Sequence, residues 1–559
     1  MLRLNDTSQL VTNTATEYGG GAYTDELSTL RVQGNASVRQ NTQTNANMGG
    51  GGIALFDQSA LALIDSAAVH DNTASGDGGG ILTYDSTLEV FDSAAIRGNT
   101  VSGDGGGIHG RFSTITMTDT VMVSDNAASL GHGGGVYFTD GCTVSCTKQA
   151  AIDSNVAKNG AGVYLDDASF RLAGNASISR NTASAAGGAV YALNMLQNSR
   201  TLKLLGGAVA SNKADSGGGG ALKVGFEGQL DVHNALFLEN TAGQSGGVLS
   251  VDATAEISSF VGANCTRNHA LRGGVAYISG GGSLLTNRSY YNDNSANLGG
   301  CFYVDANSHF SQSADTHSNS RATTGEGAAT YAMLNSEVSA MGCTYVGGIA
   351  QSNGGAFYVN LALRFAVSGS TFQDNTGIAN GGALYVIQSD DQTLSVADCV
   401  FERNNAESGG GGAAYFESIG SASAPTQVTD CVMRENVAGE NGGAVQLKDS
   451  YVRLENIRMD RNEAGDSGGG LCAEATVLDL VQVGMRGNSA SSSGGGLFAE
   501  STSTVQATGA WFSFNIAEEV RYHAACLSEF TVDDINMFDC RLGVVWPSRN
   551  LHWCATIAP

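Results

Sequence analysis

Short alternations of apolar and polar residues run along the whole chain, and no stretch shows the 3.6-residue period of an amphipathic helix. In "GGALYV" (residues 381–386), Leu384 and Val386 alternate with Ala383 and Tyr385. A second alternating piece lies about ten residues before a recurring Asn, and a third ends at that Asn. Pieces of this length and pattern predict three short β-strands in each repeated unit.

The recurring Asn marks the repeat. It returns every 25 to 32 residues, and Gly348 takes its place in the one unit that lacks it. The positions are Asn13, Asn41, Asn72, Asn99, Asn126, Asn155, Asn181, Asn212, Asn240, Asn268, Asn294, Asn319, Asn375, Asn404, Asn436, Asn462, Asn488 and Asn515. A single unit cannot bury its apolar side, so repeats of this size indicate a solenoid of about nineteen stacked coils.

The predicted fold is all-β, a right-handed parallel β-helix with three strands per coil. In such a stack each Asn lies over the previous one, and an amide side chain can both donate and accept hydrogen bonds. We therefore expect a structural ladder that includes Asn375, Asn404, Asn436, Asn462 and Asn488. The glycine pair that follows each Asn supplies the positive φ that a tight corner needs.

The β-helix is expected over residues 1–515, and residues 516–559 are expected to form a final coil and a C-terminal cap containing Cys526, Cys540 and Cys554. Leu2 and Leu4 already stand at second-strand positions, so the chain starts in the middle of a coil. A start of this kind indicates either a piece of a longer protein or an open edge that docks on a partner.

Composition narrows the possible partners. The 559 residues include 77 Gly and carry a formal net charge of −25. Such a chain repels nucleic acid and anionic membranes, so neither is expected as a partner. The start "MLRLNDTSQL" is not a signal peptide, and no apolar run is long enough for a transmembrane segment. Five glycosylation sequons, at Asn5, Asn35, Asn175, Asn264 and Asn287, are compatible with secretion.

The tetrapeptides "FLEN", "FQDN", "FERN" and "FSFN", paired with "GGAV", "GGAF" and "GGAL", resemble the repeats of the polymorphic membrane proteins of chlamydiae. The resemblance covers nearly the whole chain. It implies a pectin-lyase-like β-helix displayed at the cell surface, with roles in adhesion and antigenic variation. Many coils carry GGG instead of GGA, and Val, Ile or Met often replaces Phe. The end "NLHWCATIAP" differs from the membrane β-barrel of that family, so autotransport is not implied.

An aromatic column is the main candidate for binding. Since Leu384 and Val386 face inward, Tyr385 faces outward, and four other tyrosines occupy the same position while Tyr331 is one residue off. The candidate binding stripe is Tyr277, Tyr303, Tyr358, Tyr385 and Tyr415. Stacked tyrosines stabilise a sheet, and an exposed row of them also suits sugar rings or a protein surface. Both interpretations remain open at this stage.

No catalytic, cofactor or metal site is predicted. The two outward columns before the late asparagines read Glu402, Arg434, Asp460, Arg486 and Asp374, Arg403, Glu435, Arg461. Alternating signs favour a structural ladder of ion pairs over an active site, in which a catalytic acid would not be neutralised on both sides.

Two smaller features each allow two interpretations. Asp77 and Asp104 occupy one position in consecutive "SGDGGG" turns, which suits solvated turns better than a shared calcium ion. Cys399 and Cys431 share a core-facing position in adjacent coils, within disulfide range, where buried free thiols are the favoured interpretation. The nine His show no metal-binding spacing, and no cofactor is expected.

The leading hypothesis is a non-enzymatic cell-surface or secreted protein that binds carbohydrate or protein on a cell surface. The alternative is a carbohydrate-active enzyme, a polysaccharide lyase or hydrolase, or a carbohydrate-binding module on the same fold. Unneutralised carboxylates grouped beside Arg or Lys would favour the enzyme, and an unobstructed tyrosine stripe would favour binding.

Overall fold

The computed structural model describes residues 1–195, 201–252, 255–387, 393–500, 502–518, 530–533 and 536–538. The chain forms two compact units, Met1–Leu285 and Thr286–Pro559. Every regular element in the described ranges is a β-strand. None of these residues belongs to a helix long and apolar enough to cross a membrane.

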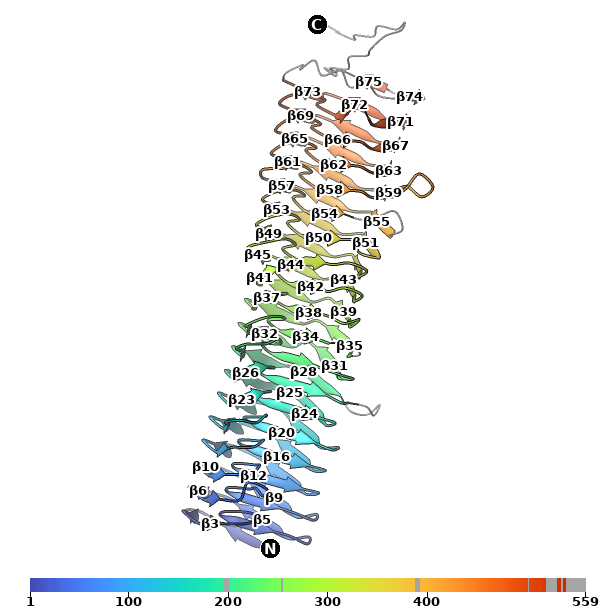
Figure 1. The fold of residues 1–559 in the computed structure, drawn as a ribbon. Coiled ribbons are helices and arrows are strands. Elements are labelled where there is room, and N and C mark those ends of the chain that lie inside the picture. The colour runs from blue at the N-terminus through green and yellow to red at the C-terminus, as the bar shows by residue number, and fades with distance from the viewer. Residues whose placement is uncertain are drawn as a thin grey trace, which may run out of the picture. The chain divides into compact units, whose positions relative to one another are not determined.

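Each unit is a stack of parallel β-coils, as the sequence predicts (Figure 1). One coil of the second unit contains β54 (Leu384–Ile387), β55 (Thr393–Ala397), β56 (Val400–Glu402) and β57 (Asn405–Ala406). These strands pair in parallel with the equivalent strands of the next coil, β58 (Ala414–Glu417), β59 (Thr426–Thr429), β60 (Val432–Arg434) and β61 (Val437–Ala438). The two units together contain about nineteen coils in the described residues. This confirms the predicted parallel β-helix.

The strands belong to three sheets. The strand after the glycines lies in sheet C, and the two predicted strands before the Asn both lie in sheet A. Sheet B consists of mostly two-residue strands directly after the Asn, such as β53 (Thr376–Gly377). These were not predicted, because two residues are too few to show alternation.

Sheet C carries the aromatic column. In the first unit its strands are β4 (Ala22–Thr24), β8 (Ile53–Leu55), β12 (Ile81–Tyr84), β16 (Ile108–Arg111), β20 (Val136–Thr139), β24 (Val163–Asp166), β27 (Val190–Leu193), β30 (Leu222–Val224), β34 (Leu249–Val251) and β38 (Ala276–Ile278). In the second unit they are β42 (Phe302–Val304), β46 (Thr330–Ala332), β50 (Phe357–Asn360), β54, β58, β62 (Val445–Lys448), β66 (Leu471–Glu474) and β70 (Leu497–Ala499).

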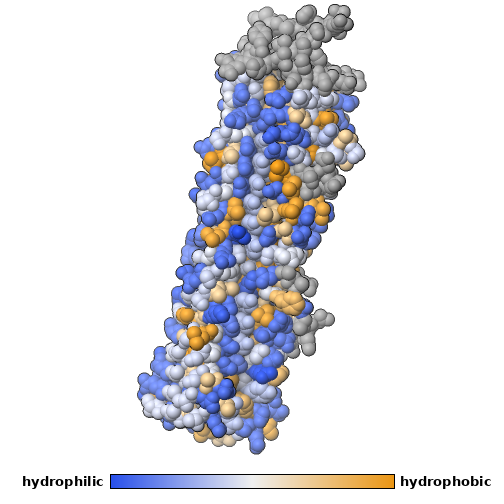
Figure 2. All heavy atoms as spheres, viewed as in Figure 1, coloured by the Kyte–Doolittle hydropathy of each residue, from blue (hydrophilic) through white to orange (hydrophobic). Residues whose placement is uncertain are grey.

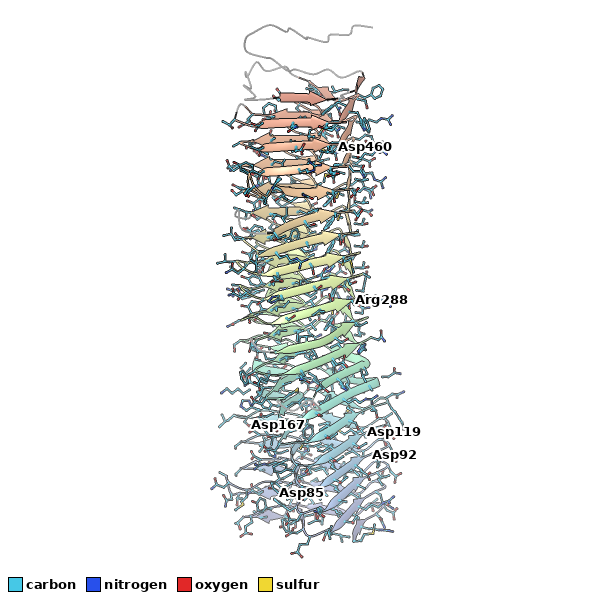
Figure 3. All side chains as sticks on the ribbon, turned by 90° about the vertical axis from the view of Figure 1, so that its right-hand side faces the viewer. Asp85, Asp92, Asp119, Asp167, Arg288 and Asp460 are labelled. Atoms are coloured by element: carbon cyan, nitrogen blue, oxygen red, sulfur yellow. The ribbon has the colours of Figure 1, made fainter. Side chains whose placement is uncertain are left out.

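Short acidic turns join the sheets. Asp85 follows β12 and Asp92 follows β13 (Thr87–Val90), so the two side chains lie at opposite ends of one sheet A strand (Figure 3). Their φ angles are 43° and 56°, the left-handed region that Asp tolerates better than most residues. Asp57 and Asp140 follow the sheet C strands of other coils and have φ angles of 49° and 48°.

A buried ladder of Asn side chains connects successive coils. The backbone N–H and the Nδ2 of Asn404 both donate to Oδ1 of Asn436, at 3.0 and 2.9 Å. The same Nδ2 donates to the carbonyl of Phe372 in the preceding coil at 3.0 Å. Asn375, Asn462 and Asn488 repeat this pattern. Each Asn therefore satisfies polar groups of three coils inside the protein.

The ladder runs through the first unit as well. It joins Asn13, Asn41, Asn72, Asn99, Asn126, Asn155, Asn181, Asn212, Asn240 and Asn268 in order. The residue before the Asn bears part of the corner's strain, because Asp374, Arg403 and Glu435 have φ angles of 54°, 52° and 56°. At the next corner Gly381 has φ 65°, and a Cβ there would lie 2.2 Å from the carbonyl oxygen of Leu384.

The expected ladder position of Asn319 is wrong. Asn319 has φ 53° and is thus the residue before the slot, and the buried residue in the slot is Ser320. The next slot holds Gly348, as predicted, whose N–H donates to Oδ1 of Asn375 at 3.0 Å. Two consecutive coils therefore lack the Asn side chain. Asn319 was misassigned because it is the nearest Asn in "HSNSR", one residue out of phase.

The shifted register places His317 in the core column that holds Phe372 and Phe401 in later coils. Its ring stacks between Tyr291 and Tyr345, with centroids 4.7 Å away on each side. Both ring nitrogens are buried without a hydrogen-bond partner. Burial lowers the pKa of His317 to about 3, and burial raises the pKa of nearby Asp315 to about 6.

We predict that Asn436→Ala destabilises the second unit by about 3 kcal/mol, because it leaves the two donors of Asn404 unsatisfied in the interior. Chemical denaturation measures the change in the free energy of unfolding. The control is Asn405→Ala, a half-exposed position in the adjacent sheet B strand, for which we expect a change within about 0.5 kcal/mol. Equal losses in both variants would contradict a special role for the ladder.

His317→Phe should stabilise the second unit, because it removes two unsatisfied buried nitrogens from an aromatic stack. The folded-state pKa lies below the unfolded value of about 6.5, so the neutral imidazole is favoured and the stability it confers is lost as pH falls from about 6.5 towards 3. The advantage of the variant should therefore grow by up to about 1.4 kcal/mol per pH unit over that window.

The measurement is the free energy of unfolding of the parent and of His317→Phe at several pH values. Asp315 is present in both proteins, so its opposite contribution cancels in the difference between their free energies. A constant difference between neutral and mildly acidic pH would refute the interior placement of His317.

Candidate functional site: the tyrosine stripe of sheet C

Five tyrosines form one column in the second unit. Tyr303, Tyr331, Tyr358, Tyr385 and Tyr415 are in register on β42, β46, β50, β54 and β58. We call this column the tyrosine stripe. The expectation that Tyr331 stands one residue off is wrong. Its coil has Ala328 where other coils have the second Gly of the pair. An alignment on the last Gly of each pair therefore displaces Tyr331 by one residue.

The rings of the tyrosine stripe stack face to face. Consecutive centroids are 4.9, 4.9, 5.3 and 5.1 Å apart, with interplanar angles of 14°, 13°, 2° and 15°. Tyr303 and Tyr415 are only 5% and 7% exposed, and the other three are half-buried. The stripe thus shows solvent mainly the edges of its rings, and it is not an unobstructed row of exposed rings.

The phenol groups have local partners. The hydroxyl of Tyr385 donates to Oε2 of Glu417 at 3.1 Å, and that of Tyr303 donates to Sδ of Met333 at 2.8 Å. Burial raises the pKa of Tyr358 to about 12 and also raises the pKa values of Tyr385 and Tyr415. The hydroxyls therefore stay protonated at physiological pH and act as hydrogen-bond donors.

A second aromatic stack lies in the first unit. His109, Tyr137, Tyr164 and Tyr191 have centroid separations of 4.9, 5.0 and 5.2 Å and interplanar angles below 10°. Lys223 and Ser250 continue the column and separate this stack from Tyr277. This stack was not predicted from the sequence, although each of its tyrosines stands four residues after a positive-φ Gly, as Tyr385 does.

Beside this stack the first unit groups two carboxylates and two imidazoles. Oδ1 of Asp77 accepts from the N–H of Asp104 at 2.9 Å, and Oδ1 of Asp104 accepts from the N–H of His132 at 2.7 Å. Nε2 of His109 lies 3.9 Å from Oδ2 of Asp77. The two carboxylates cap backbone groups of the next coil, which supports the turn interpretation. Nowhere in the described ranges do three His, Cys, Asp or Glu meet as a metal site would require.

The predicted ion-pair ladder is present in part in the second unit, and Arg486 lies over the ring of Phe514. Arg434 contacts Glu402 at 2.9 Å, Arg403 contacts Asp374 at 2.8 Å, and Arg461 contacts Glu435 at 2.6 Å. Arg403 also contacts Glu402, and Asp460 pairs with Arg458 in its own strand at 2.6 Å. Hydrogen bonding from Arg434 lowers the pKa of Glu402. An ionised, neutralised carboxylate is a poor proton donor for catalysis.

Cys399 and Cys431 are buried thiols, and Sγ of Cys431 accepts from the N–H of Cys399 at 3.4 Å. Ser289, Asp315 and Cys343 stand at the same core position in earlier coils, five residues before their ladder slots. Cys526, Cys540 and Cys554 of the predicted cap lie outside the described residues. Strands β74 (Phe530–Asp533) and β75 (Asn536–Phe538) continue the sheet A pairing beyond residue 516.

The fold and the site together define a parallel β-solenoid with stacked aromatic columns on sheet C. Comparison with family models, curated proteins and solved structures finds no match.

We predict that the tyrosine stripe titrates late. Burial raises the pKa of Tyr358 to about 12 and raises the pKa values of Tyr385 and Tyr415, so the fold favours their neutral phenols. This stability is present below the unfolded pKa of about 10 and is lost as pH rises through the folded-state pKa values. Ultraviolet absorbance of phenolate, followed in native and unfolded protein, measures the delay. Tyr358→Phe should remove part of the late phase, and titration of all tyrosines near pH 10 would contradict the buried stack.

Proposed function

We propose that the chain is a non-enzymatic cell-surface or secreted binding protein that acts in adhesion. The single observation that supports this most is the tyrosine stripe, an ordered row of phenol edges repeated at the coil spacing of roughly 4.8 Å. The resemblance to chlamydial surface repeats points the same way. The neutralised carboxylates of the ion-pair ladder weigh against catalysis on the sheet A side.

The geometry limits how the stripe binds. Since neighbouring rings cover one another, the inner tyrosines cannot offer their faces to a sugar ring in the usual stacking mode. Contacts must instead come from hydroxyl groups, ring edges and the polar side chains that flank the strands. This favours a long ligand that runs across several coils over a single sugar placed on one ring.

The alternative is a carbohydrate-active enzyme on the same fold. The grouping of Asp77, Asp104, His109 and His132 favours it, because carboxylates beside imidazoles can transfer protons. Burial raises the pKa of Asp104 and lowers the pKa of His109. Both Asp side chains already hold backbone N–H groups, so we rank this function second.

The test is binding of the purified chain to a glycan array and to cell surfaces. We expect Tyr358→Phe/Tyr385→Phe/Tyr415→Phe to weaken binding roughly tenfold, because it removes three hydroxyls and keeps the ring stack. The matched control is Tyr451→Phe, on a sheet A strand, which should bind like the parent.

Unchanged binding in the triple variant would return the stripe to a purely structural role. Cleavage of any glycan by the parent would overturn the non-enzymatic proposal and favour the enzyme.

A further inference from the structure

Charge is distributed unevenly around the second unit. Eight segments of this unit each contain one sheet C strand and the residues between it and the preceding sheet B strand. They are 299–305, 323–334, 351–361, 378–387, 407–418, 439–449, 465–475 and 491–500. They contain one cation, Lys448, and nine acidic residues. The nine are Asp305, Glu326, Glu407, Glu417, Glu440, Asp449, Asp466, Glu474 and Glu500.

The arginines of the same unit lie on other segments, and several of them are paired with acids. Arg403, Arg434, Arg453 and Arg461 each contact a carboxylate in a neighbouring coil of the sheet A side. Sheet A therefore carries charges of both signs, several of them paired with one another, whereas the sheet C segments carry carboxylates with one cation among them. The face shown in Figure 2 is largely hydrophilic, with apolar side chains scattered over it.

Several carboxylates flank the tyrosine stripe directly. Glu417 accepts from the Tyr385 hydroxyl at 3.1 Å and pairs with Lys448 at 3.1 Å. Glu326 and Glu417 both act electrostatically on Tyr358, and Glu474 acts on Tyr415. Glu474 is half-buried, and burial together with the charge of Glu500 raises its pKa. Glu474 and Glu500 thus repel each other.

We infer that the sheet C face of the second unit, made of the tyrosine stripe and the carboxylates Glu326, Glu417 and Glu474, docks an extended Lys- or Arg-rich segment of a partner protein. This inference rests on the proposed binding function and names the class of its ligand. Ammonium and guanidinium groups complement the charge of the carboxylates, and phenol edges and hydroxyls contact the aliphatic stems and backbone of such a segment.

Charge complementarity selects this occupant. Sulfated or uronic-acid glycans and anionic lipids carry the sign that the face repels. Neutral sugars bind through ring faces that the stack already covers. An extended basic segment running along the column meets a carboxylate or hydroxyl at nearly every coil, which gives several weak contacts at once.

The experiment measures binding of the full chain to fluorescent deca-lysine at low ionic strength, with acetylated deca-lysine as the neutral probe. The test variant is Glu326→Gln/Glu417→Gln/Glu474→Gln. The control variant is Asp398→Asn/Asp430→Asn/Glu463→Gln, which removes the same charge from the sheet A and sheet B sides. Asp398 and Asp430 both have φ 54°, a conformation that Asn also tolerates.

We expect the test variant to bind deca-lysine about tenfold more weakly and the control less than about twofold more weakly, with affinity falling as salt rises. Equal losses in the two variants would show that only the net charge matters and would overturn the inference. Failure of the parent to bind deca-lysine would do the same. If the parent still bound glycans or cells in that case, the proposed function would stand and only the ligand class would fall.

Discussion

The hydrogen bond between stacked Asn side chains is the interaction on which the rest of the structure depends. The Oδ1 of Asn436 accepts two N–H groups of Asn404 in the preceding coil. The Nδ2 of Asn436 donates to the carbonyl of Phe401 in that same coil and to the Oδ1 of Asn462 in the next coil. The corner is therefore tied in three coils at once. Because these groups are buried, a coil out of register leaves several of them unsatisfied, at a cost of about 1–3 kcal/mol each.

This constraint explains why columns form at all. A fixed corner places equivalent residues above one another, so a side chain meets its own kind every coil. Tyrosines become a ring stack, and alternating Arg and Glu become ion pairs. On sheet C of the second unit the same regularity places nine acids beside a single cation, Lys448. In the Asn ladder and the ion-pair ladder the side chains bond to one another. The sheet C face of the second unit carries an excess of negative charge, and it is the face that we assign to binding.

The sequence was sufficient for the fold and for most columns because the repeat is long and regular. It failed where one residue changed the phase. Ser320 took the slot assigned to Asn319, and Ala328 displaced Tyr331 by one in the alignment. The two-residue strands of sheet B carry no alternation to detect. Ring stacking that hides the faces of Tyr358 and Tyr385 depends on rotamers, which residue spacing does not determine.

Hydrogen exchange of the Asn side-chain amides, observed by NMR on Asn-labelled protein, tests the central claim most directly. The account predicts that the NH₂ groups of Asn404, Asn436 and Asn462 exchange as slowly as the core backbone amides, since each is buried and bonded on both sides. Exchange at the rate of exposed Asn side chains would contradict the ladder and the column order derived from it.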